Sequence, residues 1–70
     1  MTDDVHVEIN GRRQAVPAGQ TVRGLLDGLG LDSRLVVVEL NRQVVRSTEH
    51  DDVELTDGDR IEVVNFVGGG

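Results

Sequence analysis

The sequence contains no cysteine, so it cannot form a disulfide bond, a thiolate metal cluster or a thiol nucleophile. Its one aromatic residue, Phe66, leaves no set of rings on which the bases of a single-stranded nucleic acid could stack. No stretch approaches the roughly 18 apolar residues of a membrane span, and the first residues do not resemble a secretory signal. We therefore expect a soluble, cytoplasmic protein that packing alone stabilises.

Size and charge narrow the class of protein further. A chain of 70 residues forms one small domain, which buries only about 60% of the surface that its unfolded form exposes. Such a domain has a thin core and little room for an enclosed active site. The 13 acidic residues outnumber the 7 basic ones and give a net charge of -6. This charge disfavours a nucleic acid or an anionic membrane as partner and favours a basic protein surface.

The first part of the chain has the pattern of a β-hairpin. Val5, Val7 and Ile9 alternate with polar residues, which is the period of a strand with one buried face. The Asn-Gly dipeptide at 10–11 is a strong signal for a two-residue turn, because both central positions of that turn need a positive φ. We predict that residues 12–16 return as an antiparallel strand.

A short helix is predicted next, after residues 17–20 (PAGQ) break the sheet. Thr21 is placed to cap its N-terminus, and Gly30 to end it as the residue after the C-cap. Apolar residues at helical spacing form one stripe, which consists of Val22, Leu25, Leu26 and Leu29. A helix this short is marginal alone in water, so packing on a sheet must hold it.

Three more strands are predicted in the second half of the chain, at residues 35–40, 44–45 and 60–67. Residues 46–52 are polar and predict a surface loop with a helical turn, and residues 57–59 (DGD) predict a tight turn.

Together these elements predict an α+β fold of the β-grasp (ubiquitin-like) class, a mixed sheet of four to five strands with one helix packed across one face. The long connection allows the last strand to lie between the first and the third, parallel to the first. Ile61 and Val63 would then face the core. Val64 and Phe66 would face away from the helix, where an apolar pair is either ordinary exposure or a docking patch, and we favour docking.

The glycine run at residues 68–70 follows the last strand directly. We predict a domain over residues 1–67 and a flexible tail of Gly68, Gly69 and Gly70, because glycine lacks a Cβ and three residues reach about 10 Å into a narrow channel. A cloning remnant or a frayed terminus is the alternative. The Gly70 carboxylate is a poor electrophile, so it needs activation, for which transfer to ATP and attack by a persulfide would give a sulfur-carrying thiocarboxylate.

Several segments follow a pattern known from one family: Asn10-Gly11, residues 18–22 (AGQTV) leading into Leu25-Leu26, residues 38–41 (VELN), residues 55–59 (LTDGD) and residues 66–70 (FVGGG). Through them the chain resembles the ThiS family, the sulfur carriers of thiamine thiazole biosynthesis. Residues 46–53 depart from the family, because this segment is short and lacks the proline and tryptophan often found there.

The resemblance implies a protein co-substrate, not an enzyme. A ubiquitin-activating-type adenylyltransferase (ThiF-like) would adenylate Gly70 with ATP and Mg²⁺, a persulfide donor would supply sulfur, and a thiazole synthase (ThiG-like) would accept it. The carrier itself would bind no cofactor. Val64, Phe66 and Val67, next to the tail, are the predicted partner-docking residues.

Other polar residues are assigned no chemistry. His6 and His50 have no second ligand or nucleophile at useful spacing, so we expect both to face solvent, and we predict no metal site. The acidic residues between 49 and 59 lack the ligand order of an EF-hand and predict a solvated face that steers a basic partner.

Three alternatives stay open. The chain could be the small subunit of a molybdopterin synthase or a carrier for another sulfur-bearing product, which would use the same fold and thiocarboxylate with a different acceptor. It could be a β-grasp binding module without covalent chemistry. It could also be a modifier that is joined to lysines.

Overall fold

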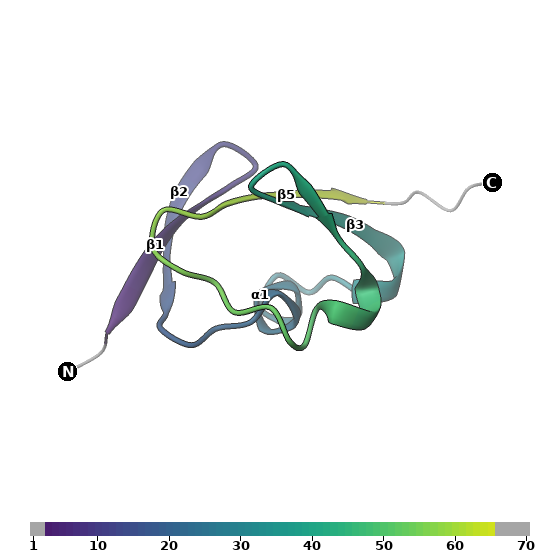
Figure 1. The fold of residues 1–70 in the computed structure, drawn as a ribbon, viewed down its shortest axis with the longest axis horizontal. Helices are drawn as coiled ribbons and strands as arrows, with labels where there is room; N and C mark the ends of the chain where they lie inside the picture. Colours follow the sequence, from purple (N-terminus) through teal and green to yellow (C-terminus); the bar gives the residue numbers. More distant parts are fainter. Residues whose placement is uncertain (1–2, 66–70) are drawn as a thin grey trace.

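The computed structural model describes residues 3–65. Five strands, one α-helix and two 3-10 helices occur within this range, in the order β1 (Asp4–Ile9), β2 (Arg12–Pro17), α1 (Val22–Gly28), η1 (Ser33–Leu35), β3 (Val36–Leu40), β4 (Gln43–Val45), η2 (Ser47–Glu49) and β5 (Arg60–Asn65). Figure 1 shows α1 on one side of the sheet. Within residues 3–65, no helix has the length and apolar character that a bilayer crossing requires.

The five strands form one mixed sheet in the order β2-β1-β5-β3-β4. The central strand β5 is parallel to β1 and antiparallel to β3. This is the β-grasp topology that the sequence predicts, with the last strand in the middle of the sheet. A long connection after β4 makes this return possible, because β5 must cross the sheet before it can pair with β1.

Two tight turns close the two hairpins of the sheet. Asn10 and Gly11 have φ values of 49° and 83°, and Ile9 pairs with Arg12, which confirms the predicted Asn-Gly hairpin. The second turn has the same geometry with different residues, since Asn41 has a φ of 51° and Arg42 a φ of 71°. A left-handed conformation costs a residue such as arginine about 1–2 kcal/mol.

The core lies between α1 and the facing side of the sheet. Its ten buried apolar residues form one cluster of Val7, Ile9, Val16, Val22, Leu25, Leu26, Val36, Val38, Leu55 and Ile61. Val63 packs against this cluster and is partly buried, so the predicted inward face of β5 is confirmed. The alternation of strand side chains places Arg60, Glu62 and Val64 on the opposite face.

The first backbone N–H groups of α1 donate hydrogen bonds to side-chain and backbone oxygens outside the helix. The Thr21 hydroxyl accepts a hydrogen bond from the Gly24 N–H at 3.0 Å, which confirms the predicted N-cap. The N–H of Val22 donates to the Val53 carbonyl and the N–H of Arg23 to the His50 carbonyl, both at 2.9 Å. A helix leaves its first N–H groups without intrahelical partners, so these bonds tie α1 to the loop before β5.

The helix ends earlier than its apolar stripe. Gly30 has a φ of 74°, as predicted for the residue that stops the helix. Leu29 is the C-cap and is 42% exposed, so its predicted place in the buried stripe is wrong. The reason is that the chain leaves the helix axis at this residue, whereas a buried position would need a further helical turn.

Three more predictions are corrected by the structure. Leu35 belongs to η1 and not to the third strand, which begins at Val36. His50 is 1% exposed and does not face solvent, because η2 turns the chain back and brings its Nε2 to 3.1 Å from the Val45 carbonyl. Asp59 is also buried, whereas the other acidic residues between 49 and 59 are exposed as predicted. Its carboxylate accepts hydrogen bonds from the Asn41 side chain and the Thr56 N–H.

Candidate functional site

Most of the predicted site lies outside the described residues. Val64 is described, whereas Phe66, Val67, Gly68, Gly69 and Gly70 are not. The geometry that bears on the site is therefore that of β5 where it leads toward residue 66, and of the side chains around it.

The strand β5 pairs with β1 only at its start, whereas it pairs with β3 up to its last described residue. Its last pair with β1 is Ile61 with Ile9, and its last pair with β3 is Asn65 with Val36, the first residue of β3. Beyond Val36 the neighbouring chain is the 3-10 helix η1, whose backbone does not continue the strand. At Asn65, its last described residue, β5 is therefore paired with the first residue of β3.

An apolar pair lies on the outer face of the sheet close to this last described pair. Val64 is directly opposite Val37 on β3, and both side chains are on the face turned away from α1. Val64 is 61% exposed, as predicted for a residue on the sheet face opposite the helix, and its docking role stays a prediction. Scattered exposed valines are common on small domains, so exposure alone does not assign a role.

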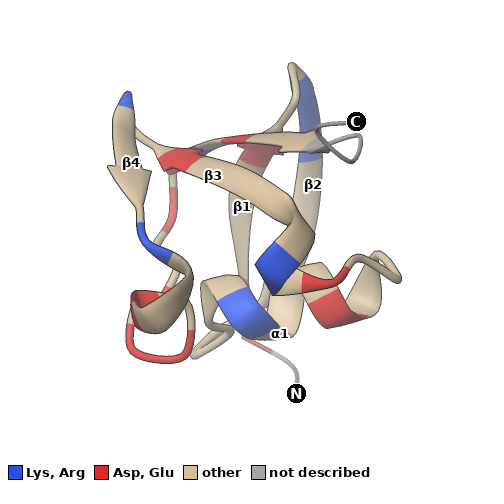
Figure 2. Ribbon diagram, turned by 90° about the vertical axis from the view of Figure 1, so that its right-hand side faces the viewer, with Lys and Arg blue, Asp and Glu red and all other residues tan. Residues whose placement is uncertain are grey.

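The next row of the outer face carries two acidic residues opposite each other. Glu39 pairs in register with Glu62, and Val44 of β4 lies on the other side of Glu39. Like charges directly across a strand pair are destabilising. Within residues 3–65 no ion pair involves either glutamate, although Arg42 and Arg60 line the same shallow hollow of about 130 Å³. Figure 2 shows acidic positions on β3 and in the loop after β4.

Leu35 is a residue near the site that the sequence patterns missed. It is 58% exposed and directly precedes Val36, the partner of Asn65, so it lies close to the end of β5. The signal for this turn is Asp32, whose carboxylate accepts a hydrogen bond from the Arg34 N–H at 2.9 Å and caps η1. An aspartate side chain often accepts a hydrogen bond from the backbone N–H two residues further along the chain, as Asp32 does here.

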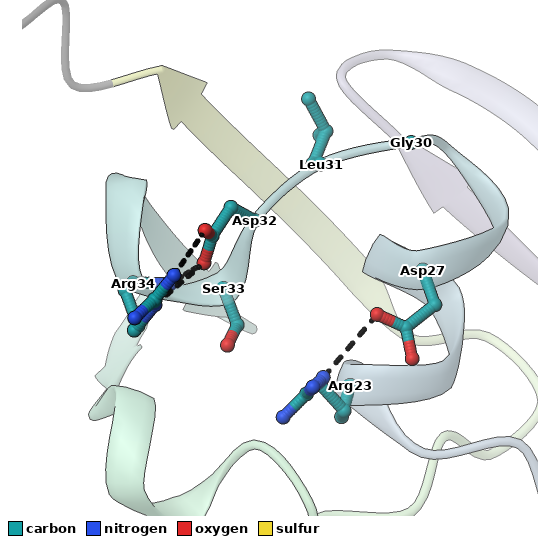
Figure 3. Close-up of a pocket in the computed structure, with 7 residues that line it drawn as sticks. All are labelled: Arg23, Asp27, Gly30, Leu31, Asp32, Ser33 and Arg34. Atoms are coloured by element: carbon teal, nitrogen blue, oxygen red, sulfur yellow. Dashed lines mark hydrogen bonds and ion pairs between the residues drawn. The ribbon is translucent and has the colours of Figure 1, made fainter.

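A hollow with a volume of about 620 Å³ lies between α1 and η1. Figure 3 shows two charge pairs on its walls, Arg23 with Asp27 at 3.2 Å and Arg34 with Asp32 at 2.9 Å. The hydrogen bonds from Arg34 lower the pKa of Asp32 from 3.8 to about 2. Each charge already has a partner within the hollow, and the hollow is open and polar, so we do not assign it chemistry.

The described residues contain no group of three or more His, Cys, Asp or Glu side chains placed to hold a metal ion. His6 is half exposed, as predicted, and its Nδ1 lies 3.8 Å from the Asp57 carboxylate. The backbone N–H of His6 also donates to that carboxylate at 2.8 Å, so Asp57 fixes the turn before β5 against β1.

Comparison with known proteins identifies the family. The ThiS family matches residues 5–70. The sulfur carrier protein ThiS of Bacillus subtilis is 42% identical over 50 residues, which cover 71% of this chain and 76% of that protein. A crystal structure of the thiamine biosynthesis protein ThiS from Geobacter metallireducens superposes with a TM-score of 0.80 at 32% identity and covers 94% of this chain and all of that one.

The chain also resembles part of a longer protein. The thiazole synthase of Paramagnetospirillum magneticum is 45% identical over 62 residues, which are 89% of this chain but 19% of that enzyme. The thiazole synthase of Magnetococcus marinus is 44% identical, and the chain covers 20% of it. The chain thus spans about a fifth of the length of these two relatives. The match over residues 5–70, the identity to a whole carrier protein and the shared topology together establish that the chain belongs to the ThiS family.

Proposed function

We propose that this chain is a sulfur carrier for thiamine biosynthesis and that the Gly70 carboxylate carries the sulfur as a thiocarboxylate. The observation that carries the proposal is the family match, which runs through the glycine tail to residue 70. The course of β5 supports it, because this central strand of the sheet is described up to Asn65, five residues before Gly70 in the sequence. In this proposal the chain is a co-substrate, and its partners supply the catalytic groups.

The proposed chemistry begins with activation of the carboxylate. A carboxylate oxygen of Gly70 attacks the α-phosphate of ATP, and pyrophosphate leaves. The product is an acyl-adenylate, in which AMP is a good leaving group on the acyl carbon. The terminal sulfur of a persulfide donor then attacks the acyl carbon and displaces AMP. A thiol cleaves the resulting acyl disulfide, so that the thiocarboxylate stays on Gly70 and the thiol is oxidised to a disulfide. Mg²⁺ and cationic groups of an adenylyltransferase would stabilise the charge on the phosphates.

We propose that the outer face near β5 docks that adenylyltransferase. Val64, with Phe66 and Val67 beyond the described residues, would supply apolar contacts together with Val37. Glu39 and Glu62 would face basic side chains of the partner, which would relieve their mutual repulsion. The net charge of -6 favours encounter with a basic surface in the same way.

Replacing Val64 and Phe66 together by Ser should weaken binding to the adenylyltransferase by about tenfold or more, because an interface loses two apolar contacts. Isothermal titration calorimetry measures the effect. The control is Val44→Ser, which removes a similarly exposed valine from β4, and β3 separates this strand from β5. Unchanged affinity of the double variant would refute this docking surface.

The acceptor of the sulfur is proposed to be a thiazole synthase. Two thiazole synthases contain a segment that resembles this chain, and such a covalent link places carrier and synthase in one polypeptide. A separate carrier of the same family would bring its thiocarboxylate to the same kind of enzyme by association.

Intact mass spectrometry tests the proposal. After incubation with ATP, Mg²⁺, a persulfide donor and the adenylyltransferase, the protein should gain the mass difference between one sulfur and one oxygen atom. A variant that lacks Gly70 should keep its fold by circular dichroism and gain no mass. If the full chain gains no sulfur, or if the shortened chain still supports thiazole formation, the carrier proposal is wrong.

A further inference from the structure

The Asn10 side chain continues the pairing of β5 beyond the point where β1 turns away. The backbone N–H of Asn10 donates to the Ile61 carbonyl at 2.9 Å, which is the last backbone bond between the two strands on that side. The next β5 residue that faces the same side is Val63. Asn10 Oδ1 accepts a hydrogen bond from the Val63 N–H at 2.8 Å, and Asn10 Nδ2 donates to the Val63 carbonyl at 3.4 Å.

These two bonds reproduce what a further strand residue would supply. A strand presents one acceptor and one donor to its neighbour at every second residue, and the carboxamide of asparagine has the same pair of groups. Asn10 therefore holds Ile61 through its backbone and Val63 through its side chain. Val63 lies two residues before Asn65, the last described residue of β5.

The turn and the side-chain contact place different demands on residue 10, and asparagine meets both. A φ of 49° favours Gly, Asn or Asp. Glycine would have no amide for Val63, and aspartate would have an acceptor but no donor for its carbonyl. Glycine can also adopt the conformation that the turn requires, so the contact with β5 is what asparagine adds at this position.

We propose that Asn10 is a positioning residue that fixes the line along which β5 leads into the glycine tail. This inference rests on the proposed function, because a carboxylate presented to an activating enzyme reacts fastest when the segment before it is held in one direction. Without the Asn10 contacts, β5 would be held past Ile61 by β3 alone, and its end could pivot about that single edge.

The chain contains a matched control in the other hairpin turn. Asn41 has nearly the same φ, 51°, and its side chain also makes two hydrogen bonds near β5. Its Oδ1 accepts from the Arg60 N–H at 2.9 Å, and its Nδ2 donates to the Asp59 carboxylate at 3.0 Å. These contacts hold the beginning of β5, whereas Asn10 holds its end. Asn10→Gly and Asn41→Gly therefore remove similar bonds from opposite ends of one strand.

Amide hydrogen exchange followed by NMR tests the contact in the isolated protein. Asn10→Gly should speed exchange at Val63 by about fivefold to tenfold and leave Arg60 unchanged, since one hydrogen bond is lost there. Asn41→Gly should do the reverse. Asn10→Asp keeps the acceptor for the Val63 N–H and should retain most of its protection. Unchanged exchange at Val63 in Asn10→Gly would refute the contact, whatever the loading results.

Steady-state loading by the adenylyltransferase tests the positioning role. Asn10→Gly should raise the KM for the carrier by about threefold to tenfold with kcat nearly unchanged, because a loosely directed tail is delivered less often. Asn41→Gly should stay within about twofold of the wild type at a temperature where both variants are folded. Equal effects of the two variants, or a normal KM for Asn10→Gly, would overturn the inference. Failure of the wild type itself to be loaded would instead contradict the proposed function.

Discussion

On the face of the sheet turned toward α1, Val7, Val38 and Ile61 are at most 1% exposed, whereas Val64 and Val44 on the opposite face are 61% and 63% exposed. The inner face repeats β-branched residues at every second position, and α1 and Leu55 cover it. The outer face combines exposed valines with the opposed pair of Glu39 and Glu62.

This difference separates residues that maintain the fold from residues that are available to a partner. Exposed valines and like charges across a strand pair add nothing to the stability of an isolated domain. Their concentration on one face, which continues along β5 toward the tail, is consistent with a surface that other proteins contact. Substitutions on the two faces should therefore differ in kind as well as in size.

The largest effect is expected on the inner face. Leu26→Ala should lower the free energy of unfolding by about 2–5 kcal/mol, because Leu26 is fully buried and its removal leaves a cavity. Urea unfolding followed by circular dichroism measures this loss. Val64→Ala on the outer face is the control and should cost less than about 0.5 kcal/mol. Similar losses at both positions would contradict the division between the faces.

A smaller effect is expected in α1, whose inner side contacts the sheet. Gly28→Ala should raise the free energy of unfolding by about 1 kcal/mol, because a Cβ there meets no atom within 4 Å and alanine favours the helix. Gly24→Ala should gain less, since its Cβ would lie 3.0 Å from the Gln20 side chain. Thermal unfolding compares the two variants. A larger gain at Gly24 would show that helix propensity outweighs the crowding at its start.

The acidic pair on the outer face, Glu39 and Glu62, should lower the stability of the isolated protein, whereas the core residues raise it. Glu39→Gln should stabilise the isolated protein by about 0.2–1 kcal/mol, because it removes the repulsion from Glu62. The same change should weaken binding to a basic partner. Asp52→Asn removes one negative charge from an exposed loop and serves as the control for net charge. A loss of stability in Glu39→Gln would mean that the glutamate makes a favourable contact in the folded protein.

The smallest effect concerns a charge pair outside both faces. Because Arg34 lowers the pKa of Asp32 from 3.8 to about 2, the folded state binds this proton less readily than the unfolded state. The stability that Asp32 adds is complete above pH 3.8 and is lost as the pH falls toward about 2. Asp32→Asn should flatten the stability profile in this window only. In Arg34→Gln, an NMR titration should show the pKa of Asp32 returning toward 3.8.

Local patterns in the sequence predicted the elements whose residues decide their own conformation. The alternation around Val7 and the Asn10-Gly11 turn predicted the first hairpin, and Thr21 and Gly30 predicted both ends of the helix. Errors occurred where contacts between elements, and not the local period of the sequence, place a residue. His50 is buried because η2 folds back toward the core, and Asp59 is buried because Asn41 and Thr56 bond its carboxylate.

The predicted site divides in the same way. Val64 is exposed on the outer face, as the period of the last strand predicted, and the glycine tail stays a prediction. Leu35 was missed because an apolar, β-branched run concealed the 3-10 turn that precedes Val36. The contact between Asn10 and Val63 joins residues 53 positions apart, and no local pattern can reveal such a contact.

By itself the sequence determined the β-grasp class, the alternation that separates the two faces of the sheet, and membership of the ThiS family, because period, turn residues and motifs are local properties. Only the tertiary structure decided which polar groups are buried, which glutamates face each other and which side chain holds the end of β5. These outcomes depend on the register between strands that are distant in the chain, and this register is set by the burial of one sheet face together with the geometry of the turns.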